Sequence, residues 1–173
     1  IYSDAAKHLG HAESVREVRA IAQEFAARHP ARIVEREQNY GLARSIAGSV
    51  TELTQAFGRV IVLEDDLVPT PDFLRFMLEG LDRYEADEHV LQISGCLLPG
   101  DVQQADGAFF LPLTTTWGWA TWKSAWSLFR PLTLADRQLL DIDSDLRQRF
   151  NAEGSADYVA MLDDRLNGRN DSW

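Results

Sequence analysis

The sequence predicts an α/β fold with a mainly parallel sheet flanked by helices, and two features of the chain carry this prediction. Short runs rich in β-branched residues alternate with longer segments whose apolar residues recur every three or four positions. One of the runs, Val60–Leu63, is apolar throughout, as is typical of a strand covered on both faces of a parallel sheet. A length of 173 residues with 45% apolar side chains is sufficient for one domain with one core.

The first half of the chain contains two expected strand–helix units. Residues 1–4 end a strand, and residues 13–28 form a helix, because apolar side chains recur there at helical spacing. Residues 32–35 are expected to form a short strand. The turn signal at residues 39–41 then leads into a second helix over residues 42–57.

The second half continues this alternation. The apolar strand at residues 60–63 is followed by a proline-rich turn and by a helix whose apolar stripe runs from Phe73 to Tyr84. Residues 90–93 and 108–111 are expected to be strands. The remainder is expected to be helical, most clearly over residues 156–166.

Charge and composition exclude several classes of protein. The net charge is −10, and residues 60–129 hold 11 acidic against 3 basic side chains, which disfavours binding to nucleic acid. No stretch approaches the roughly 20 apolar residues that a membrane-spanning helix needs. The single cysteine, Cys96, excludes an internal disulfide and a cysteine-rich zinc site, and it suits a reducing compartment.

Glu64, Asp65 and Asp66 directly follow the apolar strand and form the most informative motif. Three adjacent carboxylates repel one another, so they destabilise a strand end unless a cation or hydrogen-bond donors compensate. Hard divalent ions such as Mg²⁺ and Mn²⁺ prefer oxygen ligands of this kind. The plainer interpretation is a solvated acidic loop.

Two other folds with acidic strand ends are excluded. A receiver domain needs a phosphoacceptor Asp after a later strand, where this chain has Phe109-Phe110-Leu111-Pro112. A phosphatase of the haloacid dehalogenase type needs Asp at the first acidic position, which here is Glu64.

Five segments occur in a characteristic order and spacing: Ile1-Tyr2-Ser3-Asp4, Asn39–Ser45, Val60–Leu67, Ile93-Ser94-Gly95 and Trp117-Gly118-Trp119-Ala120-Thr121-Trp122. With these segments the chain resembles, over nearly its whole length, the GT-A glycosyltransferases, specifically bacterial sugar transferases related to the N-acetylglucosaminyltransferase I group. The resemblance implies a GT-A fold that lacks its first βα unit. It also implies one catalytic domain over residues 1–173, as a fragment of a longer chain.

The resemblance further implies an activity and a cofactor. The expected reaction moves a hexosyl or N-acetylhexosaminyl group from a UDP-sugar to a hydroxyl of a glycan or other acceptor, with inversion. The implied cofactor is Mn²⁺ or Mg²⁺, which neutralises charge on the leaving nucleotide. In the related group the acid triplet is the metal and nucleotide-sugar signature. Asp66 is therefore expected to bind the metal, and Glu64 and Asp65 to lie nearer the ribose and donor sugar.

Asp4, Asn39 and Arg44 are further candidates for binding the nucleotide sugar. The resemblance implies that Asp4 contacts the uracil or ribose, whereas a turn residue or cap is the plainer interpretation. Asn39, like Asp4, follows a strand, and ligands of α/β sheets bind beyond the carboxyl ends of strands. Arg44 is expected either to meet the pyrophosphate or to form a surface salt bridge.

Tryptophans gather in one short segment at positions 117, 119, 122 and 126. Tryptophan rings stack on sugar faces but also fill cores, and Trp119, Trp122 and Trp126 match one helical face. Core packing is therefore expected for Trp122 and Trp126. Trp117, which precedes Gly118 in a threonine-rich loop, is the candidate for substrate contact.

The catalytic base is expected to be a carboxylate near the acceptor hydroxyl. In the resembling group this base is an Asp shortly before a Trp, downstream of the Trp-rich run. Asp171 precedes Trp173 by two positions and matches that pattern. Asp164 and a residue beyond Trp173 are the alternatives.

A second class of function is a non-catalytic sugar-binding module, in which the tryptophans bind glycans and the acids hold a structural cation. Metal-dependent binding of a nucleotide diphosphate favours the enzyme, whereas glycan binding indifferent to nucleotide favours the module. No nucleic-acid partner and no membrane-spanning segment are expected. The expected location is the bacterial cytoplasm, with peripheral attachment to the inner membrane as a second possibility.

Overall fold

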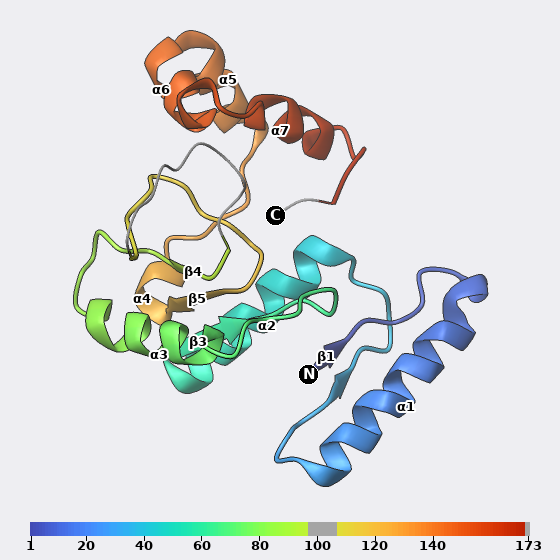
Figure 1. Cartoon of the computed structure of the whole chain (residues 1–173). Coiled ribbons are helices and arrows are strands. Elements are labelled where there is room, and N and C mark those ends of the chain that lie inside the picture. The colour runs from blue at the N-terminus through green and yellow to red at the C-terminus, as the bar shows by residue number, and fades with distance from the viewer. Residues whose placement is uncertain (97–106, 172–173) are drawn as a thin grey trace. The chain divides into compact units, whose positions relative to one another are not determined.

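The computed structural model describes residues 1–96 and 107–171, in which helices alternate with short strands (Figure 1). By their internal packing these residues divide into two compact units. The first unit contains residues 1–49 and the C-terminal segment from Asp164, and the second contains residues 50–163. One boundary between the units therefore falls inside helix α2 (Leu42–Phe57).

The first unit is built on a two-stranded parallel sheet. β1 (Tyr2–Ser3) pairs with β2 (Val34–Glu35), and Tyr2 lies opposite Val34. A 3-10 turn (Leu9–His11) and the long helix α1 (Ala12–Arg28), blue in Figure 1, connect the two strands. The predicted strand–helix–strand order is confirmed, although both strands are shorter than expected.

α1 covers this sheet with one face. Its half-buried residues recur at helical spacing and include Ala12, Val15, Arg19, Ala22 and Ala26. The side chain of Arg19 contacts both strands, which identifies this face as the one over the sheet. Val18, Ile21 and Phe25, which also predicted the helix, are 57%, 68% and 48% exposed. The apolar residues of α1 are therefore divided between a covered and an exposed face.

α2 has the bounds that the sequence predicted, Leu42–Phe57. It begins directly after Gly41, whose φ of +75° lies in the left-handed region that favours glycine. Val50 and Thr54, in the part of α2 that belongs to the second unit, are fully buried. The Thr54 hydroxyl donates to the carbonyl of Val50 at 2.7 Å, so its polar group is satisfied within the helix.

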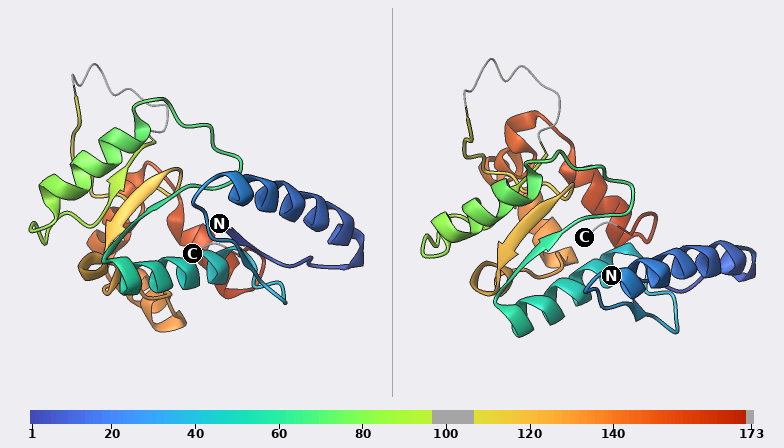
Figure 2. Two further views of the ribbon diagram at one scale, coloured as in Figure 1. Left: turned by 90° about the horizontal axis from the view of Figure 1, so that it is seen from below. Right: turned by 60° about the horizontal axis from the view of Figure 1, so that its bottom comes forward.

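The second unit contains a three-stranded sheet in the order β3–β5–β4 (Figure 2). Its strands are β3 (Arg59–Val62), β4 (Ile93–Ser94) and β5 (Trp119–Trp122). β5 is antiparallel to both neighbours, and Ala120 lies opposite Ile61 on one side and Ile93 on the other. Among the described residues, the parallel pairing that was expected of the sheet occurs only between β1 and β2.

Three predictions for the second unit are wrong. Trp119–Trp122 is the central strand rather than part of a helical face, because all four residues are buried and continuous burial leaves no alternating pattern. β3 is half-buried, not covered on both faces. Residues 108–111, expected as a strand, have no regular secondary structure, and Phe110 is 67% exposed.

The core of the second unit lies between the sheet and α3 (Phe73–Tyr84), a helix with the predicted bounds. Its buried residues are Phe73, Met77, Leu81, Ile93, Ala120 and Trp122. The indole Nε1 of Trp122 donates to the carbonyl of Leu81 at 3.1 Å, which satisfies the polar atom of a buried ring. The expectation that Trp122 packs in the core is confirmed.

Short helices follow β5. They are α4 (Lys123–Trp126), α5 (Leu134–Ile142), α6 (Ser144–Phe150) and α7 (Tyr158–Leu166), with a 3-10 turn at Ala152–Gly154. Thr133 and Asp136 form a capping box that satisfies backbone N–H groups at the start of α5. The guanidinium of Arg137 lies 2.7 Å from the carboxylate of Asp163, which ties α5 to α7.

Gly95, directly after β4, provides a test of this packing. A Cβ at this position would lie 2.5 Å from the Phe73 ring and 2.6 Å from the Met77 methyl group. Gly95→Ala should therefore lower the free energy of unfolding by about 1–3 kcal/mol, the usual cost of overpacking. Gly48→Ala is the control, because that helix position has open space around it and alanine should stabilise it by about 0.5–1 kcal/mol. The midpoint of urea unfolding should fall for Gly95→Ala and rise for Gly48→Ala. Equal stability of Gly95→Ala and the unaltered protein would contradict the packing described for Gly95.

Candidate functional site

The carboxylate of Asp4 fixes the loop between β2 and α2 to the end of β1. Its Oδ1 accepts hydrogen bonds from the N–H groups of Ala5 at 3.0 Å and Tyr40 at 2.9 Å. Its Oδ2 accepts from the N–H groups of Tyr40 and Gly41, both at 3.0 Å. The structure therefore gives Asp4 the role of a turn residue, and its contact with a nucleotide stays a prediction.

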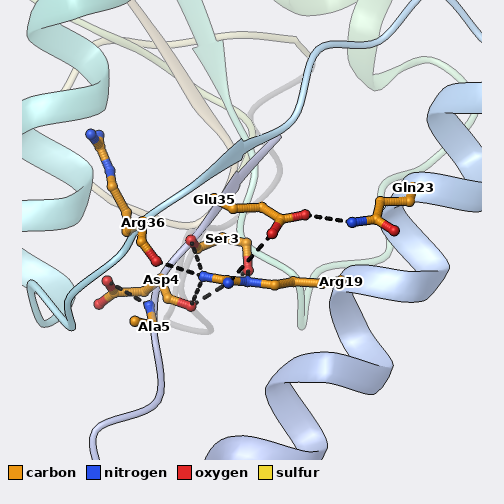
Figure 3. A network of polar contacts seen from close by, with 7 residues as sticks. All are labelled: Ser3, Asp4, Ala5, Arg19, Gln23, Glu35 and Arg36. Atoms are coloured by element: carbon orange, nitrogen blue, oxygen red, sulfur yellow. Dashed lines mark hydrogen bonds and ion pairs between the residues drawn. The ribbon is translucent and has the colours of Figure 1, made fainter.

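Arg19 of α1 binds the same strand ends (Figure 3). Its Nε donates to the hydroxyl of Ser3 at 3.2 Å, and its Nη2 donates to the carbonyl of Arg36 at 2.8 Å. Its Nη1 lies 3.4 Å from the carboxylate of Glu35. The sequence analysis missed this residue. The available signal was a cation on the α1 face that is otherwise formed by small and apolar residues.

Asn39 and Arg44 lie on either side of the turn that Asp4 holds. The side-chain amide of Asn39 donates to the carbonyl of Ala5 at 2.7 Å. The guanidinium of Arg44 lies 4.1 Å from the centre of the Tyr40 ring, within the range of a cation–π contact. The surface salt bridge considered for Arg44 is not present within the part of the chain that the structure describes.

Asp171 reaches this turn from the C-terminal segment of the first unit. Its Oδ2 accepts from the N–H of Leu42, the first residue of α2, at 2.6 Å. Gly41 leaves room for this contact, because a Cβ at that position would overlap with the Asp171 carboxylate. Three consecutive N–H groups, from Tyr40 to Leu42, are thus bound by two carboxylates. Asp164, the alternative base, is ion-paired with Arg169 at 2.7 Å.

The acid triplet lies in the second unit, directly beyond β3. Glu64 is half-buried, whereas Asp65 and Asp66 are exposed. Burial raises the pKa of Glu64, and the negative charges of Asp66 and Asp65 raise it further. Repulsion among the three carboxylates is therefore a cost that nearby positive charge would reduce. Among the described residues, no three His, Cys, Asp or Glu side chains are arranged to hold a metal ion by themselves.

Trp117 lies two residues before β5. The β3–β5 register ends at the pair Val62 and Trp119, so the acid triplet leaves β3 at the end of the sheet where the chain enters β5. A Cβ at Gly118 would be in ordinary contact with the Leu63 side chain, at 3.6 Å, so these two segments are adjacent. The N–H of Gly95 donates to the carbonyl of Gly118 at 2.8 Å, which fixes the other side of this segment. The indole of Trp117 is 52% exposed and is therefore accessible to a ligand.

The predicted site residues are thus found in two groups, one in each unit. The first group surrounds the turn before α2 and contains Asp4, Asn39, Arg44 and Asp171. The second group lies at one end of the β3–β5–β4 sheet and contains Glu64, Asp65, Asp66 and Trp117. Asp4 follows β1 and the acid triplet lies just beyond β3, whereas Trp117 precedes β5 and Asp171 follows α7.

Residues 13–113 match the family model described as glycosyl transferase family 2. The match covers more than half of the chain, and this protein therefore belongs to glycosyl transferase family 2. Membership implies the GT-A fold, a nucleotide-sugar donor and an acceptor, and it supports the glycosyltransferase over the sugar-binding module. Curated proteins and solved structures give no match. No helix within the described residues is both long and apolar enough to cross a bilayer.

Removal of the Asp4 carboxylate tests its role in the turn. Asp4→Ala leaves the N–H groups of Ala5, Tyr40 and Gly41 without their acceptor. The free energy of unfolding should fall by about 1.5–3 kcal/mol, the range for hydrogen bonds to charged groups. Asp171→Ala removes one exposed acceptor at a helix start and should cost about 1 kcal/mol. Urea denaturation compares the two, and a larger loss for Asp171→Ala would contradict the assigned order.

Proposed function

We propose that this protein transfers a hexosyl or N-acetylhexosaminyl group from a UDP-sugar to a hydroxyl of a glycan or other acceptor, with inversion and with a divalent metal ion. Within its family we place it near the N-acetylglucosaminyltransferase I group. The observation that carries the proposal is the acid triplet at the end of β3, where a half-buried Glu64 precedes two exposed carboxylates, Asp65 and Asp66. A divalent cation would offset the repulsion among these three carboxylates.

The donor chemistry of the triplet fits Mn²⁺ or Mg²⁺. Both ions prefer oxygen ligands, and Mg²⁺ sites commonly use one or two carboxylates completed by substrate phosphates and water. Such a site needs fewer protein ligands than a preformed cage. Asp66 would hold the ion, and Glu64 and Asp65 would contact the ribose and the donor sugar. When bound, the ion neutralises charge on the departing diphosphate.

The first unit provides groups suited to a nucleotide. A carboxylate such as Asp4 accepts a hydrogen bond from the N3–H of uracil, a donor that cytosine lacks. Asn39 is held next to Asp4 by its bond to Ala5 and is the second proposed contact. The guanidinium of Arg44, positioned against Tyr40, would bind phosphate oxygens.

The proposed acceptor chemistry needs one carboxylate and one apolar surface. Asp171 is exposed, so a hydroxyl can approach it and lose its proton as the sugar is transferred. Direct displacement assisted by such a base inverts the anomeric centre. Trp117 would stack its exposed ring on a sugar face. A cytoplasmic location in a bacterium agrees with the single cysteine of the sequence.

Asp66→Ala tests the metal assignment. The variant should lose Mn²⁺-dependent binding of UDP, because the proposed metal ligand is missing, while its melting temperature without metal stays close to that of the unaltered protein. Calorimetric titration with UDP, with and without Mn²⁺, measures the effect. Asp72→Ala is the control, because this exposed carboxylate precedes α3, is paired with Arg75 of that helix and is not a proposed metal ligand. Unchanged Mn²⁺-dependent affinity in Asp66→Ala would refute the assignment.

Asp171→Asn tests the base in the full-length protein. The amide retains a hydrogen-bond acceptor for Leu42 but cannot take a proton, so turnover should fall by on the order of 10²–10⁴-fold. The affinity for the donor should barely change, because the base acts on the acceptor. Asp164→Asn is the matched control and should keep near-normal turnover. Normal turnover in Asp171→Asn would remove this residue from the mechanism.

A further inference from the structure

One guanidinium group, that of Arg19, binds the ends of both strands of the first unit (Figure 3). Its Nη2 faces three backbone carbonyls, those of Arg36 at 2.8 Å, Asp4 at 3.3 Å and Ser3 at 3.5 Å. Its Nε and Nη1 reach the Ser3 hydroxyl and the Glu35 carboxylate. Gln23, one turn further along α1, donates to the same Glu35 carboxylate at 2.7 Å. A single side chain of α1 thus contacts the last residues of both strands.

The position of this cation is not explained by packing alone. Arg19 is only 21% exposed and lies on the covered face of α1, where an apolar side chain would pack without the cost of removing a charge from water. The guanidinium instead provides a rigid fork of donors that matches several acceptors at fixed directions. A lysine in its place would keep the charge but lose that geometry.

The residues that Arg19 holds are connected directly to the turn before α2. The Asp4 carbonyl that it binds belongs to the residue whose carboxylate accepts from Tyr40 and Gly41. Arg36, whose carbonyl it also binds, is the first residue of the loop that leads to the same turn. Arg19 therefore binds the backbone of Asp4 itself and the backbone at the start of the segment that leads to the turn.

We propose that Arg19 is a positioning residue for the nucleotide. It does not touch the donor, and it acts by fixing the direction of the Asp4 carboxylate and the place of the turn at residues 39–41. This inference rests on the proposed function, in which Asp4, Asn39 and Arg44 contact the nucleotide.

Arg19→Met is the principal test, because methionine preserves the length of the side chain and removes every donor. Arg28→Met is the matched control, since Arg28 lies on the same helix, is exposed and is paired with Glu24 of that helix. Hydrogen exchange at the Tyr40 and Gly41 amides should be about 10- to 100-fold faster in Arg19→Met and unchanged in Arg28→Met. Exchange inside α1 and α3 should not change in either variant.

Nucleotide binding provides the second measurement. The affinity for UDP should fall roughly 10- to 100-fold in Arg19→Met, and the preference for UDP over CDP should fall with it. The double variant Asp4→Asn with Arg19→Met should be no weaker than Asp4→Asn alone, because both changes act through one carboxylate. Arg19→Lys should lose part of the preference for UDP at an unchanged melting temperature.

The outcomes separate this inference from the proposed function. If the unaltered protein binds no nucleotide, the proposed function fails, while the exchange rates at Tyr40 and Gly41 still decide whether Arg19 fixes the turn. Wild-type exchange at these amides in Arg19→Met overturns the inference, as does a uniform rise in exchange throughout the first unit, which indicates a general structural role. If Arg19→Met does not fold, the same measurements are made on Arg19→Lys. Wild-type exchange at the Tyr40 and Gly41 amides of Arg19→Lys, together with a wild-type preference for UDP, overturns the inference.

Discussion

The first unit depends on hydrogen-bond partners for the backbone polar groups at the ends of its two short strands, β1 and β2. β1 and β2 are too short to pair the N–H and C=O groups that follow them, and such groups must find partners when they leave water. Asp4 supplies the acceptor for the N–H groups, and Arg19 supplies the donors for the carbonyls. Charged side chains therefore satisfy backbone N–H and C=O groups that additional strand residues would otherwise pair. The edge expected to bind the donor is consequently also the edge that holds the unit together.

The second unit places its candidate residues by close packing instead. The Phe73 ring lies beneath the backbone at both Gly95 and Gly118, and a Cβ at either position would come within 3.0 Å of it. Gly118 has a φ of +68°, so the chain turns sharply there before it enters β5. The indole of Trp117, one residue before this turn, is 52% exposed, whereas Trp119 and Trp122 inside β5 are buried.

Sequence patterns predicted the helices well, because α1, α2 and α3 are long and carry clear apolar periodicity. They failed for β5, since a strand buried on all sides has no alternation and its tryptophans happen to recur at helical spacing. The acid triplet was located from local sequence alone. The partners of Asp4 and Asp171 were not, because they are backbone amides far away in the chain, and no local pattern encodes such a contact. Arg19 did leave a local signal, a cation on the covered face of α1, but the strand-end carbonyls that it binds lie 15 to 17 positions away.

The bond between Asp171 and Leu42 joins residues 129 positions apart. During synthesis on a ribosome, β1, α1 and the start of α2 emerge long before Asp171, and chains generally fold in the order in which their parts emerge. The amide of Leu42 must therefore stay hydrated while the whole second unit is made. Closing so long a loop costs more entropy than forming any local turn, although the cost grows only with the logarithm of loop length. The first unit is for that reason expected to be completed only after the segment that contains Asp171 has been translated.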